Sequence, residues 1–280
     1  MDVVMPYKSI VTYIEDKPDT QPWLKTAVEI ARQYSAHLTI AVHSRLADHP
    51  PFIYGDASGM AVAEFIEESK QATEALVAAA REVLLAEDIL GEVCPVAYPY
   101  GAPGYEFGRL AQFADLIVLG GMYGAGAGKT MAEVFSGALF DCDATLLAAP
   151  SGMGALRPDN ILIAWNDSRE ALRAVRRAMP LLGKAGTVTI LMIDPSTRAD
   201  DMPGAELATM LDRYGIKAEI STIPRGNQPV GDLIAQRAQE AGADLVVMGG
   251  YGHSRFQEYV LGGATRDFLK QLPVPVLMAH

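Results

Sequence analysis

Apolar runs and helical periodicities alternate along this chain, and the same order occurs twice. Short apolar runs in the first half predict five strands, at Ser9–Ile14, His37–His43, Glu92–Ala97, Leu116–Leu119 and Ala144–Ala148. Helical spacing between them predicts helices at Gln21–Tyr34, Ala61–Leu85, Gly104–Gln112 and Met131–Phe140. The second half predicts strands at Ile161–Trp165, Val188–Ile193, Ala218–Ile223, Leu245–Met248 and Val274–Met278. Its predicted helices are Ser168–Leu182, Ala205–Tyr214, Gly231–Ala241 and Phe256–Gln271. This alternation predicts an α/β fold with parallel sheets covered by helices on both faces.

One segment of the sequence is nearly repeated. Residues 114–121 read Ala-Asp-Leu-Ile-Val-Leu-Gly-Gly, and residues 243–250 read Ala-Asp-Leu-Val-Val-Met-Gly-Gly. The separation of 129 residues is the size of a domain and too long for a solenoid unit. We therefore expect two copies of one domain, at 1–150 and 158–280, joined by a glycine- and proline-containing linker at Ser151–Pro158.

Composition narrows the class of protein. A formal net charge of −11 over 280 residues argues against a nucleic acid or an anionic membrane as a partner, because both require a basic face. The N-terminal segment has no basic, apolar leader, and no apolar run is long enough to span a bilayer, so we expect a cytoplasmic protein. The only two cysteines, Cys94 and Cys142, form neither a disulfide framework nor a metal motif. His37, His43 and His49 fall six apart, a spacing that does not suit a metal pair, and we expect no metal site.

The glycine-rich loop after the strand Leu245–Met248 is the strongest candidate for chemistry. It reads Gly249-Gly-Tyr-Gly-His-Ser-Arg255, and Gly262-Gly-Ala-Thr265 follows where a second helical segment can open. Glycines let main-chain N–H groups approach a phosphate, and a helix N-terminus adds partial positive charge. His253, Ser254, Arg255 and Thr265 supply further donors. The alternative is a strand-to-helix turn that needs glycine only for its backbone conformation.

These residues resemble the universal stress protein family. The spacing Gly249-x2-Gly252-x9-Gly262 is that of its ATP-binding loop, the tail Pro273-Val-Pro-Val-Leu277 is similar to its closing segment, and Asn166-Asp-Ser168 is similar to the turn after its first strand. The resemblance, once per copy, implies two adenine nucleotide α-hydrolase-like domains with strand order 3-2-1-4-5. It also implies fifth strands that pair edge to edge, so the copies would form an intramolecular pseudo-dimer. Whether tandem chains pair further into a homodimer is left open.

The resemblance also assigns roles at the site. Asn166 would meet adenine or ribose, Ile193 would offer backbone groups to adenine, and the remaining residues would line the base and the phosphates. The complete set is Asn166, Ile193, Met248, Gly249, Gly252, His253, Gly262, Gly263, Ala264 and Thr265. Two positions depart from the family pattern: Gly263 replaces a serine or threonine, and Asn166 replaces an aspartate. Each lost contact to a charged group is worth about 1.5–3 kcal/mol, so binding is expected to be weakened.

The corresponding loop of the first copy looks degenerate. Its Gly128-Lys-Thr130 suggests a P-loop, but Tyr123 stands where that motif needs glycine, and the loop follows a fourth strand. Under the family pattern, twelve residues separate Gly124 from Gly137 instead of nine, and Ala138 follows in place of a hydroxyl. The first copy is therefore expected to be a partner domain without a working nucleotide loop.

Three functions remain open from the sequence. The first is a stress-response regulatory protein whose second copy binds ATP or a related adenine nucleotide, with or without Mg²⁺. The second is a protein-interaction module, with an unknown protein partner, whose two clefts are vestigial and hold no cofactor. The third is a slow nucleotide hydrolase; the acidic residues nearest the loop are Asp167 and Glu258, and no catalytic residue is identified.

Overall fold

The computed structural model describes residues 7–16, 18–43, 59–96, 103–123, 129–150, 153, 155–195, 202–250 and 263–280. The first copy contains β1 (Ser9–Ile14), η1 (Pro18–Thr20), α1 (Pro22–Tyr34), β2 (His37–Val42), α2 (Gly59–Ala86), β3 (Gly91–Pro95), α3 (Pro103–Ala111), β4 (Leu116–Gly120), α4 (Lys129–Phe140) and β5 (Thr145–Ala149). The second contains β6 (Asn160–Ala164), α5 (Arg169–Leu182), β7 (Thr187–Ile193), α6 (Ala205–Asp212), β8 (Glu219–Ile223), α7 (Val230–Glu240), β9 (Leu245–Gly249), α9 (Ala264–Gln271) and β10 (Val276–Ala279). The predicted alternation of strands and helices is confirmed.

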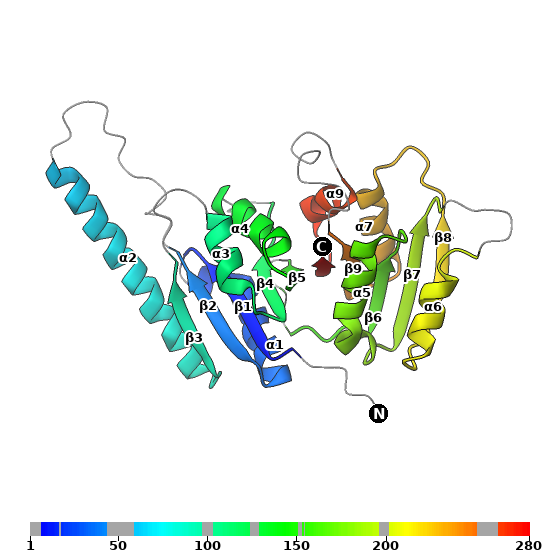
Figure 1. Ribbon diagram of the computed structural model, residues 1–280, viewed down its shortest axis with the longest axis horizontal. Coiled ribbons are helices and arrows are strands. Elements are labelled where there is room, and N and C mark those ends of the chain that lie inside the picture. The colour runs from blue at the N-terminus through cyan, green and yellow to red at the C-terminus, as the bar shows by residue number, and fades with distance from the viewer. Residues whose placement is uncertain are drawn as a thin grey trace.

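All ten strands form one sheet, in the order β3-β2-β1-β4-β5-β10-β9-β6-β7-β8. Each copy contributes five parallel strands in the order 3-2-1-4-5, as the resemblance implied. The two copies meet at β5 and β10, which run antiparallel with Leu277 opposite Leu147. Figure 1 shows the two units side by side with these strands at the centre. The expected intramolecular pseudo-dimer is confirmed.

Two apolar layers cover the sheet, and each layer continues from one copy into the other. One face packs against α1, α2, α5 and α6, with Ile30, Val175 and Leu211 among its buried residues. The opposite face packs against α3, α4, α7 and α9, with Phe107 and Phe268 in its core. Leu156, in the expected linker, is 2% exposed and packs into the first layer. The copies therefore share their cores across the β5–β10 pair.

The repeated Ala-Asp-Leu segment has the same structural role in both copies. Asp115 Oδ2 accepts hydrogen bonds from the main-chain N–H groups of Lys8 (2.7 Å) and Ser9 (2.9 Å). Asp244 Oδ2 accepts two from Asp159 and Asn160, both at 3.0 Å. Each carboxylate thus holds the start of the first strand against the start of the fourth. This explains why the aspartate recurs with the apolar run.

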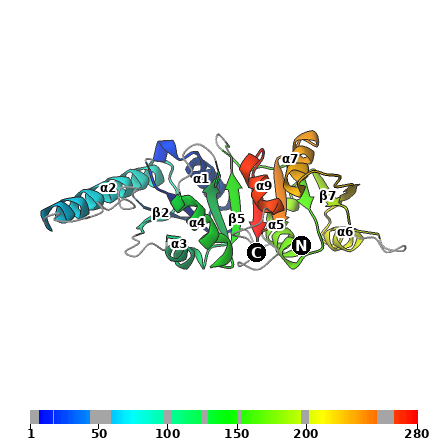
Figure 2. The ribbon, with the colours of Figure 1, turned by 90° about the horizontal axis from the view of Figure 1, so that it is seen from above.

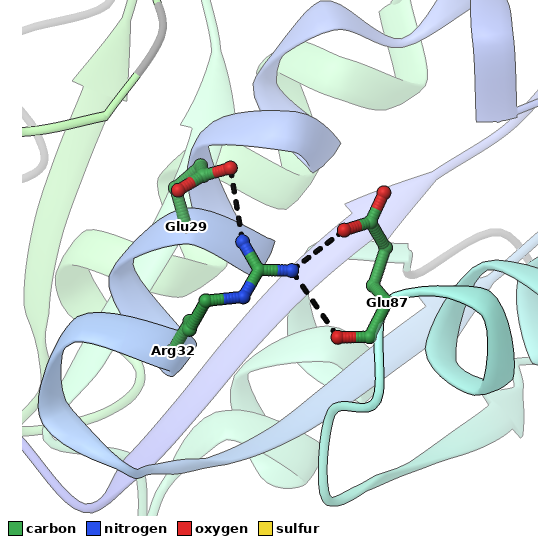
Figure 3. Close-up of polar contacts among 3 residues, drawn as sticks. All are labelled: Glu29, Arg32 and Glu87. Atoms are coloured by element: carbon green, nitrogen blue, oxygen red, sulfur yellow. Dashed lines mark hydrogen bonds and ion pairs between the residues drawn. The ribbon is translucent and has the colours of Figure 1, made fainter.

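The long helix α2 projects from one end of the molecule, as Figures 1 and 2 show. Its C-terminal end is tied to α1 by Arg32, which bonds Glu29 (3.0 Å) and the Glu87 carboxylate (2.6 Å) (Figure 3). The hydrogen bond to Glu87 is the main cause that raises the pKa of Arg32. Arg32 also donates to the Glu87 main-chain carbonyl at 3.2 Å, which helps close the turn after α2.

Gly137 lies inside α4 and is not the last glycine of a nucleotide loop, which corrects the family-based alignment of the first copy. A methyl group at Gly137 would overlap the main-chain carbonyl of Gly104 in α3. The position therefore permits close contact between two helices. In the second copy Gly231 has this role, because its Cβ would lie 2.6 Å from Phe268 N in α9. Sequence spacing counted this packing glycine as part of the loop.

Candidate functional site

The candidate site lies at the carboxyl end of β9, where the strand order of the second copy reverses between β6 and β9. Open parallel sheets bind ligands at such a point. Gly249 ends β9 directly against the first turn of α5, since a Cβ there would lie 2.7 Å from Ala171 N. Glycine therefore allows the helix N-terminus to reach the end of the strand.

The N-terminus of α5 is capped by a side chain that directly precedes the helix. Ser168 is the N-cap, and its hydroxyl accepts a hydrogen bond from Ala171 N at 3.1 Å. Asn166 Oδ1 accepts from Ser168 N at 3.3 Å, which fixes the exposed turn in which Asp167 has φ of +60°. Asn166 thus lies exposed at the edge of the site, and its side-chain oxygen already accepts a hydrogen bond from Ser168 N. Its amide group remains the donor that a ligand oxygen or ring nitrogen would meet.

The N-terminus of α9 lacks such a cap. Gly263 is its N-cap, in extended backbone with φ of −122°, and it offers no side-chain acceptor to the first-turn N–H groups. A Cβ at Gly263 would meet no described atom within 4 Å. Thr265 Oγ1 donates to the main-chain carbonyl of Gly249 at 3.4 Å, and this brings the α9 terminus to the end of β9. Two helix N-termini therefore converge at Gly249, one capped and one open.

Arg266 adds positive charge at this terminus, and the sequence reasoning missed it. It lies in the first turn of α9, where acidic residues are normally favoured by the helix dipole. Its guanidinium pairs with Asp267 at 3.4 Å, and the side chain is 36% exposed. The signal available in the sequence was a basic residue two positions after Ala264, in the first turn of a helix. A positive charge at that position would be unfavourable without an anion or the paired carboxylate.

The predicted site residues divide into three groups. The open helix terminus contains Gly263, Ala264 and Thr265, while Asn166 and Gly249 lie beside the neighbouring helix. Met248 is 4% exposed in the core below Gly249, and Ile193 ends β7 with a partly buried side chain. The side chain of Met248 packs in the apolar core and supports the end of the strand. Gly252, His253 and Gly262 lie outside the described residues.

The first copy has a different arrangement at the equivalent point. Gly120 ends β4, and a Cβ there would overlap the six-membered ring of Trp23 from α1. The indole Nε1–H donates to the main-chain carbonyl of Tyr13 at 2.8 Å. A side chain therefore bridges the ends of β1 and β4 where the strand order reverses. His43, opposite Ile14 at the end of β1, is also buried, and its Nδ1 lies 3.1 Å from Val96 O.

Three further features of the described part of the chain bear on function: metal binding, membrane insertion and the two cysteine thiols. No group of three or more histidine, cysteine or acidic side chains there is placed to hold a metal ion. Cys94 and Cys142 are both free thiols, and burial is the main cause that raises the pKa of each. Among the described helices, none has the length and apolarity needed to cross a membrane.

Comparison with known protein families gives a match for the second copy. Residues 158–280 match the sequence profile of the universal stress protein family. These residues form a universal stress protein domain. The two convergent helix termini and the loop from Gly249 to Gly263 therefore belong to a universal stress protein fold. Among curated proteins, no sequence gives a significant match to the chain.

Solved structures extend the likeness of fold to the whole chain. A universal stress protein from Archaeoglobus fulgidus DSM 4304 is 18% identical, covers 99% of this chain and 98% of its own, and has a TM-score of 0.67. A Pseudomonas aeruginosa UCBPP-PA14 protein described as a universal stress protein is 17% identical, covers 97% and 92%, and has a TM-score of 0.59. The universal stress protein from Archaeoglobus fulgidus solved in complex with dAMP is 18% identical, covers 51% and 98%, and has a TM-score of 0.32. The first two show that both copies share the fold of full-length universal stress protein structures.

Proposed function

We propose that the second copy of this protein, its universal stress protein domain, binds ATP or a related adenine nucleotide, and that the protein is a stress-response regulatory module. The observation that carries the proposal is the N-terminus of α9 beside the end of β9, with a glycine, Gly263, as its N-cap and Arg266 in its first turn. The main-chain N–H groups of a helix N-terminus, helix polarity and a guanidinium all favour a bound phosphate.

The residues of the site fit the two ends of a nucleotide. Ala264 and Thr265 begin the helix that would meet the phosphates, and the Asn166 amide at the mouth would meet the ribose or the base. Ile193 ends β7 on the same edge of the sheet and would contribute backbone groups to the base. No group of three metal-ligating side chains lies in the described part of the site.

Calorimetric titration with ATP, ADP and AMP, each with and without Mg²⁺, tests the proposal. We expect saturable binding that is stronger for the nucleotides with more phosphates, because the phosphates would meet the positive helix end. No heat at millimolar nucleotide, from protein shown to be folded by circular dichroism, would refute it. Incubation of ATP with the protein for hours, followed by detection of ADP or AMP, separates binding from slow hydrolysis.

A second candidate function is supported by two residues of the site. Gly263 provides no hydroxyl where the family pattern has a serine or threonine, and Asn166 provides no charge where it has an aspartate. A module that binds a protein and has lost nucleotide binding would show this combination.

Variants at these two positions distinguish the candidates. Gly263→Ser and Asn166→Asp should each tighten nucleotide binding about tenfold if the wild type already binds, since each restores one contact worth at least about 1.5 kcal/mol. Gly263→Ala is the matched control, because its methyl group enters the same open space without a hydroxyl. Binding that appears only in Gly263→Ser would favour the protein-interaction module.

A further inference from the structure

The end of α4 in the first copy lies against the start of the glycine loop in the second copy. A Cβ at Gly250 would come within 2.9 Å of the Leu139 side chain, and the Phe140 ring meets the His280 ring edge to face with centroids 4.9 Å apart. Leu139 is 2% exposed and Gly250 is buried, so these contacts are part of the packed joint between the copies.

His280 links this joint to the main chain of the loop. Its Nδ1 lies 2.9 Å from the Gly250 carbonyl; because a carbonyl only accepts, Nδ1 carries the proton and donates. Gly250 N in turn donates to Ala279 O at 2.9 Å. Arg173 from α5 donates to the main-chain oxygen of His280 at 2.8 Å. Both main-chain polar groups of Gly250 are therefore fixed, one residue after Gly249.

The first copy lacks the equivalent link. Gly121 has the symmetric packing contact, since a Cβ there would lie 3.2 Å from a methyl carbon of Leu272. However, the residue that follows β5 is Pro150, which has neither a side-chain donor nor an N–H group. The imidazole bond is thus present only on the side of the second copy's loop.

We propose that the first copy positions the end of β9 at the candidate site of the second copy, through Leu139, which packs against Gly250, and Phe140, whose ring meets that of His280. This inference rests on the proposed nucleotide function and gives the first copy a role in it. The hydrogen bonds of the Gly250 peptide fix the end of β9. The first copy then lowers the conformational freedom that ligand binding would otherwise have to remove.

Variants of the full chain test this role by calorimetry with ATP. We expect His280→Ala to weaken binding about tenfold and Phe140→Ala to weaken it about threefold. His280→Asn should stay within about twofold of the wild type, because the asparagine amide can donate from nearly the Nδ1 position. The matched control is Lys184→Met. It removes another contact between the copies, the Lys184 ammonium 4.8 Å from the centre of the Tyr34 ring, on the face away from the loop, and should leave affinity unchanged.

A second measurement needs no ligand. Amide hydrogen exchange of the segment Val246–Gly250 and of α9 should be faster in His280→Ala and Phe140→Ala than in the wild type and Lys184→Met. Equal exchange in all four proteins overturns the inference, as does an affinity loss in Lys184→Met as large as that in Phe140→Ala. If the wild type binds no nucleotide, the proposed function fails, and the exchange data still decide whether the first copy holds the loop.

Discussion

Trp23 lies directly over Gly120, with its indole against the end of β4 and its Nε1–H bonded to Tyr13 O at 2.8 Å. At the equivalent point of the second copy, Gly249 meets the main chain of α5 instead. A planar bicyclic ring with an N–H donor thus occupies the switch point of the first copy, where such folds place a planar ligand. The two copies share topology but differ in what fills this place.

Trp23→Gly should open this point and make it receptive to a small planar ligand. Loss of the half-buried indole should lower the free energy of unfolding by about 2–4 kcal/mol. Millimolar indole should then raise the thermal midpoint of the variant but not that of the wild type, because a matching cavity can bind the missing ring. Differential scanning fluorimetry with and without indole measures both effects.

Leu24→Ala is the control for this experiment. Leu24 is the next residue of α1 and is 2% exposed, so its truncation also destabilises the protein, but it leaves Trp23 in place. An indole effect of equal size in Leu24→Ala, or none in Trp23→Gly, would mean that the indole does not occupy a ligand-like site.

Asp115→Ala and Asp244→Ala should both destabilise the protein, because each removes a carboxylate that accepts two main-chain hydrogen bonds. We expect a loss of about 1–3 kcal/mol for each, and the smaller loss for Asp244, which is more exposed. Urea denaturation measures the change. The asparagine variants should fall between alanine and the wild type, since they keep a neutral acceptor. Alanine variants as stable as the wild type would mean that the repeated aspartate does not hold the strand start.

Tyr7→Phe should change how stability depends on alkaline pH. Tyr7 O–H donates to Arg177 O at 2.9 Å across the joint between the copies, so the variant should lose about 1 kcal/mol near pH 7. Burial raises the pKa of Tyr7 above its ordinary value near 10. The folded protein therefore keeps the proton above pH 10 while the unfolded chain releases it. Stability of the wild type should then fall by up to about 1.4 kcal/mol per pH unit from this group.

Urea denaturation of both proteins at pH 8, 10 and 11 checks this prediction. The difference in unfolding free energy between them should narrow as the pH rises, because the variant lacks the ionising group. Tyr34, whose ring lies 5.2 Å from that of Tyr7 and whose pKa burial also raises, contributes equally to both proteins. A difference that stays constant from pH 8 to 11 would contradict the assignment.

Much of the site was predictable from the sequence because its signals are local. Gly249 follows an apolar run, and Gly263 precedes a helical segment at Ala264, so both helix and strand ends could be placed by pattern alone. Gly137 lies within the predicted helix Met131–Phe140, but its contact with Gly104 was not predictable, because a glycine needed between two helices is identical in sequence to one needed in a loop. The domain limits at 150 and 158 remain predictions, as do the ligand roles of all ten predicted site residues, of which Gly252, His253 and Gly262 lie outside the described residues.

The sequence by itself determined the elements, their order and the duplication, because hydrophobic periodicity and turn residues act over a few neighbouring positions. Only the tertiary structure decided that Trp23 covers Gly120, that α9 begins with an open terminus beside Gly249, and that His280 bonds Gly250. Each of these depends on residues brought together by the tertiary structure, across 16 positions for Gly249 and Thr265, 30 for Gly250 and His280, and about a third of the chain for Trp23 and Gly120. No local pattern records such contacts, because their geometry is set by how the two apolar layers pack around one continuous sheet.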